Sequence, residues 1–234
     1  MRLSTAGASD IGKVRKMNQD RYICNDDAKL YVVADGMGGH QAGDVAAKMA
    51  VDELNQTFSF KKHSLDPEKH LVQTIHNANA KIYESAKENS EFKGMGTTVT
   101  ALYFTMDSVY IAHVGDSRAY LMHGKHIWQL TEDHSLASNE MVSGLNVPLK
   151  NVLTRSVGYD PQVEVALYVK KLSKGDRFLI CSDGLHGNLS SQEMVHAITK
   201  RFSLADGCKN LIQSANAKGG DDNITAVLIS VDEV

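Results

Sequence analysis

The chain has 234 residues, of which 42% are hydrophobic, and a formal net charge of −3. This length allows one sizeable domain or two small ones, and the charge balance excludes wholesale binding of nucleic acid, which needs a basic surface. No run of about 18 uncharged apolar residues predicts a membrane span, and residues 1–10 lack the apolar segment of a signal peptide. The three cysteines form no CxxC pair, so we expect no disulfide framework and a location in the reducing cytoplasm.

The first third of the chain predicts a buried strand followed by two helices. Leu30–Ala34 is a short apolar run that ends at Asp35-Gly36, as a buried strand does. Apolar residues then recur from Ala47 to Phe58 with the spacing of one face of a helix. A second helix is predicted over Glu68–Asn89, where apolar residues again share one stripe.

In the middle of the chain the apolar period changes to two. Four strands with very short connections are predicted there: Thr97–Phe104, Ser108–Val114, Arg118–His123 and His126–Leu130. Such connections forbid parallel pairing, so these strands are expected to form one antiparallel meander. Trp128, in the last of them, alternates with polar neighbours and is expected in the core.

The last third predicts two strands and two helices. Phe178–Ser182 is an apolar strand that ends, like the first, in an Asp-Gly pair. Ser190 and Glu193 have the spacing of a capping box before a helix, a further helix covers Leu204–Ala215, and the chain ends in the strand Ile224–Val231. Strands and helices are segregated along the chain, which predicts an α+β fold with helices outside antiparallel sheets.

Five short acidic stretches each place an aspartate beside a turn or strand end. These aspartates are Asp20, Asp35, Asp116, Asp183 and Asp222. Asp35 and Asp183 end predicted strands and Asp222 begins one, so an antiparallel arrangement can bring them to one sheet edge. Convergence of like charges costs free energy unless cations bind there, and a hard-metal site is therefore the first hypothesis.

The chemistry of this set points to phosphate. All the donors are oxygens, the carbonyl of Gly36 among them, which favours Mg²⁺ or Mn²⁺ over zinc. Arg15, five residues before Asp20, is suited to bidentate binding of phosphate oxygens. A single Asp-Gly pair is usually only a turn, so the argument depends on the ordered set.

The order of eight motifs resembles that of the type 2C metal-dependent protein Ser/Thr phosphatases, the PPM family, in their short bacterial form. The matching segments are Val14–Asp20, Val33–His40, Gly94–Thr98, His113–Tyr120, Leu130–Leu136, Asn151–Arg155, Leu179–Leu185 and Asp221–Thr225. The resemblance covers essentially the whole chain. It implies one phosphatase catalytic domain over residues 1–234, with a short flap near 134–158. Its fold would be a four-layer αββα sandwich, with two packed antiparallel β-sheets flanked by helix pairs.

The same resemblance implies the ligands of a centre with two Mn²⁺ or Mg²⁺ ions and a weaker third. Asp35 would bridge two ions, and the Gly36 carbonyl would serve one of them. Asp183 and Asp222 would hold the other ion, and Asp116 would hold the third together with Asp183. Asp221 receives no role.

Arg15 and Asp20 are the catalytic residues that the resemblance implies. Arg15 would bind the substrate phosphate, and Asp20 would act in the outer shell through water. His40 is either a substrate contact or a structural loop residue. Met37 stands where some members carry a histidine that protonates the leaving group, so that proton would come from water at the metal site. The segment between His134 and Asn151 is shorter than the usual flap of the family, which makes substrate preference least transferable over residues 138–150.

The function implied is hydrolysis of phosphoserine and phosphothreonine in proteins by a metal-activated water, without a phosphoenzyme. The cysteines lack the Cys-x5-Arg spacing of thiol phosphatases. Partners would be phosphorylated proteins, the substrates of a Ser/Thr kinase, and we expect a monomer. One alternative is a catalytically degenerate, phosphoprotein-binding adaptor, which should have lost at least one metal carboxylate. Another is a phosphatase dedicated to anti-sigma-factor-like partners.

Overall fold

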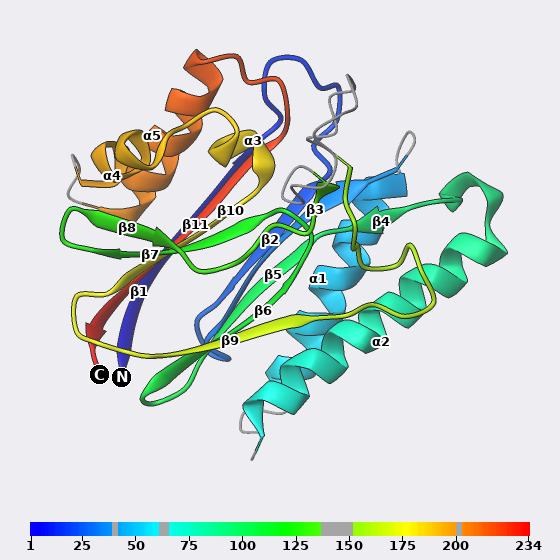
Figure 1. The fold of residues 1–234 in the computed structure, drawn as a ribbon, viewed down its shortest axis with the longest axis horizontal. Helices are drawn as coiled ribbons and strands as arrows, with labels where there is room; N and C mark the ends of the chain where they lie inside the picture. The colour runs from blue at the N-terminus through cyan, green and yellow to red at the C-terminus, as the bar shows by residue number, and fades with distance from the viewer. Residues whose placement is uncertain (39–41, 61–65, 137–151, 200–202) are drawn as a thin grey trace.

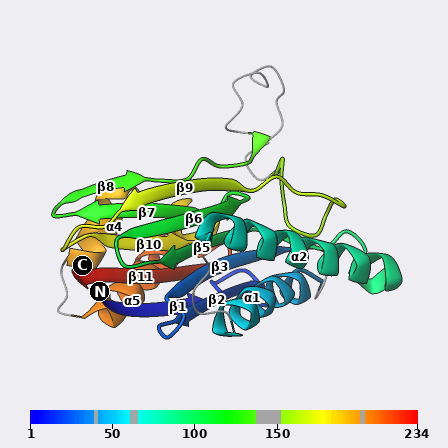
Figure 2. The same ribbon diagram turned by 90° about the horizontal axis from the view of Figure 1, so that it is seen from below.

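The computed structural model describes residues 1–38, 42–60, 66–136, 152–199 and 203–234. Two antiparallel sheets pack face to face, and each carries a pair of helices on its outer side (Figure 1). Figure 2 shows the same two helix pairs on opposite sides of the strands. The predicted α+β sandwich of four layers is therefore confirmed.

The first sheet has the order β1-β11-β10-β7-β8. In this order its strands are Arg2–Asp10, Ile224–Glu233, Arg177–Cys181, Arg118–His123 and His126–Gln129. Helices α4 (Ser191–Thr199) and α5 (Leu204–Ala217) cover its outer face. The predicted capping box begins α4, since the Ser190 N–H donates to Glu193 Oε2 over 2.9 Å.

The second sheet has the order β2-β3-β5-β6-β9, with the short β4 paired to β3. Its strands are Asp20–Asn25, Leu30–Met37, Val99–Phe104, Ser108–Val114 and Ala166–Lys171, and β4 is Gly96–Thr97. Helices α1 (Ala42–Phe60) and α2 (Pro67–Glu88) cover its outer face, and the single turn η1 (Ser90–Phe92) follows α2.

Apolar side chains fill all three spaces between the four layers. Between the sheets, Phe104 makes edge-to-face contacts with Tyr31 and Phe178, at ring-centroid distances of 5.6 and 5.4 Å. Such pairs add to the stabilisation that burial of the rings provides. Cys181 and Cys208 are buried free thiols. Among the described residues, no helix is long and apolar enough to cross a bilayer.

The predicted single meander is wrong at one point. β5 pairs with β6 in the second sheet, whereas β7 pairs with β8 in the first. The chain changes sheet over residues 115–117, where Gly115 has a φ of +107°. Alternation of apolar residues reports that a strand is half-buried but does not report which sheet it joins. This crossover brings Asp116 to the end of both sheets.

Three strands, β1, β2 and β9, were not predicted from the sequence. β1 and β2 consist mostly of small or polar residues that are only partly buried, so they give no apolar run, whereas β9 contains the short apolar run of residues 166–169. The expectation for Trp128 is also wrong: it is 49% exposed and stacks on His126 at 5.7 Å. β8 is the edge strand of its sheet, a position that leaves Trp128 about half exposed.

Candidate active site

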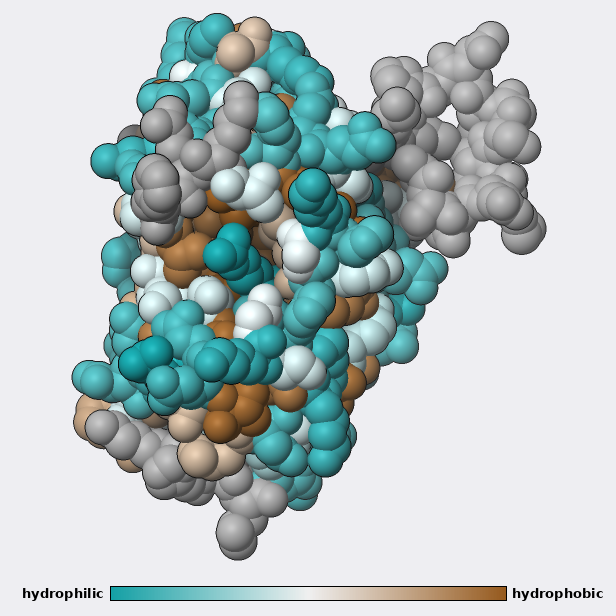
Figure 3. All heavy atoms as spheres, turned by 90° about the vertical axis from the view of Figure 1, so that its left-hand side faces the viewer, coloured by the Kyte–Doolittle hydropathy of each residue, from teal (hydrophilic) through white to brown (hydrophobic). Residues whose placement is uncertain are grey.

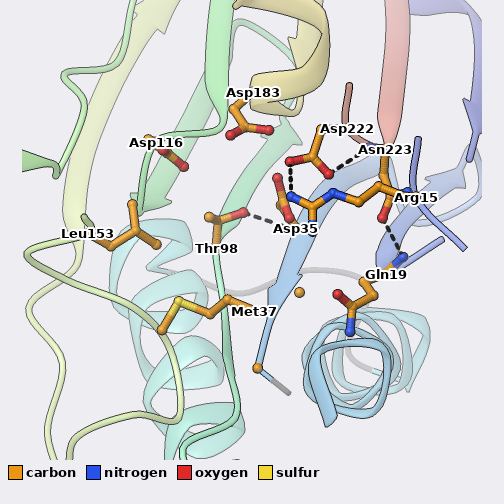
Figure 4. A pocket seen from close by; sticks show the side chains of 12 residues that line it. Arg15, Gln19, Asp35, Met37, Thr98, Asp116, Leu153, Asp183, Asp222 and Asn223 are labelled. Carbon is orange, nitrogen blue, oxygen red and sulfur yellow. Dashed lines mark hydrogen bonds and ion pairs between the residues drawn. The ribbon is translucent and has the colours of Figure 1, made fainter. Parts of the chain in front are cut away.

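Residues from seven separate parts of the chain meet at one end of the sandwich and line a cavity of about 210 Å³ (Figure 4). Six of the predicted site residues line this cavity: Arg15, Asp35, Gly36, Asp116, Asp183 and Asp222. Asp20 lies buried behind them, close enough to Asp183 and Asp222 for mutual repulsion. His40 falls outside the described residues. The structure thus brings the distant acidic stretches together.

Asp35 is held at the centre by its backbone. Its N–H donates to Thr98 Oγ1 over 2.9 Å, and its carbonyl accepts from the Thr98 N–H over 2.8 Å. β3 extends three residues past Ala34, so Asp35 and Gly36 belong to the strand itself and do not follow it. At Gly36, a Cβ atom would lie 2.0 Å from the carbonyl oxygen of Gly43 in α1. No side chain fits there, which leaves the main chain beside the cavity.

Asp20 begins β2 directly opposite Asp35 in the sheet register. Its side chain is 2% exposed, and its Oδ2 accepts from Thr225 Oγ1 over 2.6 Å and from Ser182 Oγ over 2.7 Å. Its Oδ1 is buried and has no hydrogen-bond partner among the described residues. Burial raises the pKa of Asp20 to about 6, against the effect of the two hydroxyl donors. Asp20 is therefore a rigidly held carboxyl group with one oxygen that has no hydrogen-bond donor among the described residues.

Asp183 and Asp116 face the cavity from the first sheet and from the crossover. Asp183 opens the short helix α3 (Asp183–His186), and its Oδ1 is also buried without a partner in the described structure. Burial, and then repulsion from Asp222, raise the pKa of Asp183. Asp116 is 9% exposed, and burial together with repulsion from Asp183 raises its pKa to about 7.

Asp222 lies just before β11 and forms an ion pair with Arg15, the residue predicted to bind the substrate phosphate. The Arg15 Nη2 donates to Asp222 Oδ2 over 2.6 Å. Asn223 holds the loop that carries Arg15, because its Nδ2 donates to the carbonyls of Ile11 and Met17, each over 2.9 Å. The Arg15 side chain is 51% exposed, so it remains accessible from solvent.

The donor chemistry of this site fits divalent cations. Burial, followed by repulsion from Asp20, Asp183 and their neighbours, raises the pKa of Asp35 well above its ordinary value. Carboxylates that repel one another in this way, with two buried oxygens unpartnered, are stabilised by hard cations. The side chains do not form a preorganised coordination site, since no group of three His, Cys, Asp or Glu side chains among the described residues is positioned to hold a metal ion. Cation binding would thus require carboxylate rotation and release of Asp222 by Arg15.

Comparison with known proteins decides the family. Residues 7–228 match the family model for Protein phosphatase 2C. The chain belongs to the protein phosphatase 2C family.

Individual relatives agree with this assignment over nearly the whole chain. A serine/threonine phosphatase, stp, of Listeria monocytogenes is 37% identical over 237 residues, which cover 96% of this chain and 94% of the relative. The solved serine/threonine phosphatase PstP/Ppp of Mycobacterium tuberculosis superposes with a TM-score of 0.90 at 30% identity, covering 99% of both chains. A PstP catalytic domain described in complex with two manganese ions gives a TM-score of 0.89 at 31% identity, again covering 99% of both chains.

This member of the family is a metal-dependent protein serine/threonine phosphatase, and phosphorylated proteins are its substrates. Three polar residues that line the cavity had no role in the sequence analysis: Gln19, Thr98 and Asn223. Each of them lies inside one of the eight matching motifs, but the motifs do not predict which residues their side chains contact. Side-chain bonds to distant backbone, such as the 2.8 Å bond from the Gln19 N–H to Asn223 Oδ1, leave no periodic signal in sequence.

Proposed function

We propose that this phosphatase holds two divalent cations, Mn²⁺ or Mg²⁺, with Asp35, Asp183, Asp222 and the Gly36 carbonyl. Asp116 with Asp183 would hold a weaker third. The observation that carries the proposal is the convergence of these groups around one cavity of about 210 Å³. The solved relative with two manganese ions supports the number and one choice of metal. When bound, the cations supply an activated water and offset charge on the phosphate under attack.

The chain's own residues bind and orient the substrate. Arg15 exchanges Asp222 for the equatorial oxygens of the phosphate, a change that its exposure permits. Asp20, fixed by Ser182 and Thr225, orients water in the outer shell. The Met37 side chain lies at the cavity and has no proton to give, and no histidine lines the cavity among the described residues (Figure 4). The proton for the leaving group then comes from water.

A thiol mechanism has no support in the structure. Burial raises the pKa of the Cys181 thiol far above neutrality, so no thiolate forms near the site at physiological pH. A degenerate adaptor has no support either, since every predicted carboxylate is present and near the cavity.

We further propose that residues 1–234 form one catalytic domain with a flap near 134–158. Most of that segment lies outside the described residues, but its two ends pair with each other. The Leu136 N–H donates to the Val152 carbonyl and the Thr154 N–H to the His134 carbonyl, both over 2.9 Å. Leu153 lines the cavity, so substrate bound there contacts the base of the segment. A kinase that phosphorylates the same substrates, a monomeric state and a cytoplasmic location remain predictions.

Hydrolysis of a phosphothreonine peptide tests the metal mechanism. We expect turnover with Mn²⁺ and loss of turnover with a chelator, restored by an excess of the metal. Titration of the metal-free protein by calorimetry should give two strong sites and a weaker third. Equal hydrolysis with and without chelator would overturn the mechanism, and a single site would overturn the proposed ligand set.

A further inference from the structure

The outer face of the first sheet extends beyond its helix cover and ends in a largely polar row. Ser4, Ser230, Arg177 and Met122 are register partners on four neighbouring strands, β1, β11, β10 and β7. Two residues further along each strand lies an apolar row beneath α4 and α5, which includes Leu179 and Leu228. The polar row therefore marks the edge of the packed helix layer.

Two cavities open at this row, with volumes of about 590 and 440 Å³. They share Arg177, Ser230 and Asp232 and are called here the Arg177 cleft. Figure 3 views the side of the molecule that carries α4, α5 and both termini, and shows hollowed hydrophobic surface rimmed by hydrophilic residues. Cavities of this size are typical of small-molecule sites, and the lining here combines several polar side chains with a few apolar ones.

The Arg177 side chain is half-buried in this cleft and has no partner among the described residues. Among the arginines that the structure describes, it alone makes no ion pair with a carboxylate, and its guanidinium makes no hydrogen bond to any described residue. The hydroxyl of Ser230, next to it in register, has no partner in the described structure either. A half-buried guanidinium loses hydration without recovering it in ion pairs, which favours an anion from solution.

The charges around Arg177 also favour an anion. The larger cavity is lined by three basic side chains, Arg2, Lys174 and Arg177, and by one acidic side chain, Asp232. Asp232 is already engaged, since its Oδ2 accepts from Ser4 Oγ over 2.6 Å and lies 3.9 Å from Arg2 Nε. The donors of Arg177 and Ser230 are thus free to bind a ligand.

We propose that the Arg177 cleft binds a small organic phosphate. The forked guanidinium and the Ser230 hydroxyl would bind the phosphate oxygens, and Lys174 would add positive charge. A tetrahedral oxyanion uses this many donors better than a carboxylate does. The apolar walls are narrow, because Met122, Val231 and Ile198 are almost fully buried. Together with the half-buried Leu204 they would contact the organic part.

This site is separate from the catalytic cavity. Arg177 begins β10, and Asp183 follows its other end six residues later, which places the two about 20 Å apart. A ligand in the Arg177 cleft therefore leaves the catalytic carboxylates free, and the proposal does not depend on the metal mechanism.

Amide NMR of the chelator-treated full chain tests this inference, because chelation prevents hydrolysis of the probe. The probes are inorganic phosphate, phenyl phosphate and phenylacetate. We expect saturable shifts of the amides of Arg177 and Ser230, with phenyl phosphate binding at least tenfold more tightly than either other probe. Arg177→Gln should weaken phenyl phosphate at least tenfold and leave peptide hydrolysis by the metal-loaded enzyme unchanged.

Lys171→Gln is the matched control, since it removes one positive charge from β9, the preceding strand, which belongs to the second sheet and where the Lys171 side chain is 86% exposed. It should leave binding unchanged, and Ser230→Ala should weaken binding less than Arg177→Gln does. Equal loss in Arg177→Gln and Lys171→Gln would overturn the site. Shifts confined to the cavity around Asp35 would also overturn it. If phenylacetate bound as tightly as phenyl phosphate, the assignment of a phosphate ligand would be overturned. If inorganic phosphate bound as tightly as phenyl phosphate, the role of the apolar walls would be overturned.

Discussion

Asp221 and Asp222 are neighbours in sequence, but only one of them reaches the catalytic cavity. Asp222 lines the cavity and pairs with Arg15, whereas Asp221 is exposed outside it. The pair shows that the acidic stretch alone does not identify the functional carboxylate. The position relative to β11 identifies it, because the Asp222 side chain is held at the start of this strand by the Asn223 N–H, which donates to Asp222 Oδ1 over 2.8 Å.

Asp222→Asn should lower kcat for a phosphothreonine peptide roughly 10²-fold, because it removes a proposed metal ligand and the Arg15 partner while keeping the side-chain shape. Asp221→Asn makes the same chemical change one residue away and should keep the wild-type rate. Steady-state kinetics at saturating Mn²⁺ measure both. Similar rates for the two variants would contradict the assignment of Asp222.

Asp20 gives a prediction about pH and stability. Burial raises its pKa from 3.8 to about 6, so the folded state holds this proton more tightly than the unfolded chain does. Its contribution to stability is complete below about pH 3.8 and is lost as the pH rises through about 6. Asp20→Asn removes the ionisation but keeps an oxygen for Ser182 and Thr225.

In chelator, Asp20→Asn should therefore be more stable than wild type at pH 8, by roughly 2–3 kcal/mol at about 1.4 kcal/mol per pKa unit. Near pH 4 the two free energies of unfolding should converge. Urea unfolding across this pH range measures the difference. A constant difference at all pH values would show that the effect is steric and not electrostatic.

At the scale of elements, the crossover from β6 to β7 decides where Asp116 lies. Gly115 makes this turn with a φ of +107°, and a Cβ atom there would lie 2.6 Å from Thr98 Cγ2. Thr98 in turn supports the Asp35 backbone and lies 2.8 Å from Ser117 Oγ through its own Oγ1. One glycine therefore links the positions of two proposed metal ligands.

Gly115→Ala should destabilise the fold by more than about 2 kcal/mol, since it combines backbone strain with a steric clash. Gly124→Ala is the control: its φ is +62°, but no atom lies within 4 Å of the added Cβ. Gly124→Ala should lower the free energy of unfolding only by the backbone strain, about 1 kcal/mol. Thermal unfolding with matched kinetics compares the two, and an equal cost for both would contradict the packing argument.

At the scale of the whole molecule, the site joins segments that are far apart in the chain. Residues 15, 35, 116, 183 and 222 all meet at one end of the sandwich. A cation bound there would cross-link both sheets and the loops that extend from them. Ligand binding to the folded state alone adds to the free energy of unfolding by mass action.

Mn²⁺ at about 100 times its Kd should add about 2.7 kcal/mol to that free energy. For a chain of this size, this corresponds to a rise in Tm of roughly 5–10 °C. Asp183→Asn should lose most of the rise, whereas NaCl at equal ionic strength should give none in the wild type. Scanning calorimetry tests this, and equal Tm values with Mn²⁺ and with chelator would contradict cation binding at this site.

The sequence by itself determined the elements that have a strong apolar signal. The strands beginning at Leu30 and Ile224 and helices α1, α2 and α5 follow from apolar periodicity, and the family follows from eight motifs in order. β1 and β2 left no such signal, because partly buried strands need no apolar run, and the apolar run of residues 166–169 in β9 is too short for periodicity to distinguish a strand from a helix. Trp128 is exposed because β8 is an edge strand, and the order of strands in a sheet cannot be inferred from the local alternation of apolar and polar residues.

Only the tertiary structure decided how the strands divide between two sheets and which polar groups have partners. Arg15 pairs with Asp222 across 207 positions of sequence, and Ser182 and Thr225 hold Asp20 across 162 and 205. The same is true of Arg177, whose lack of a partner appears only when every neighbouring strand is in place. Local sequence sets backbone preference and apolar spacing, whereas burial, pKa and charge pairing arise from long-range contacts.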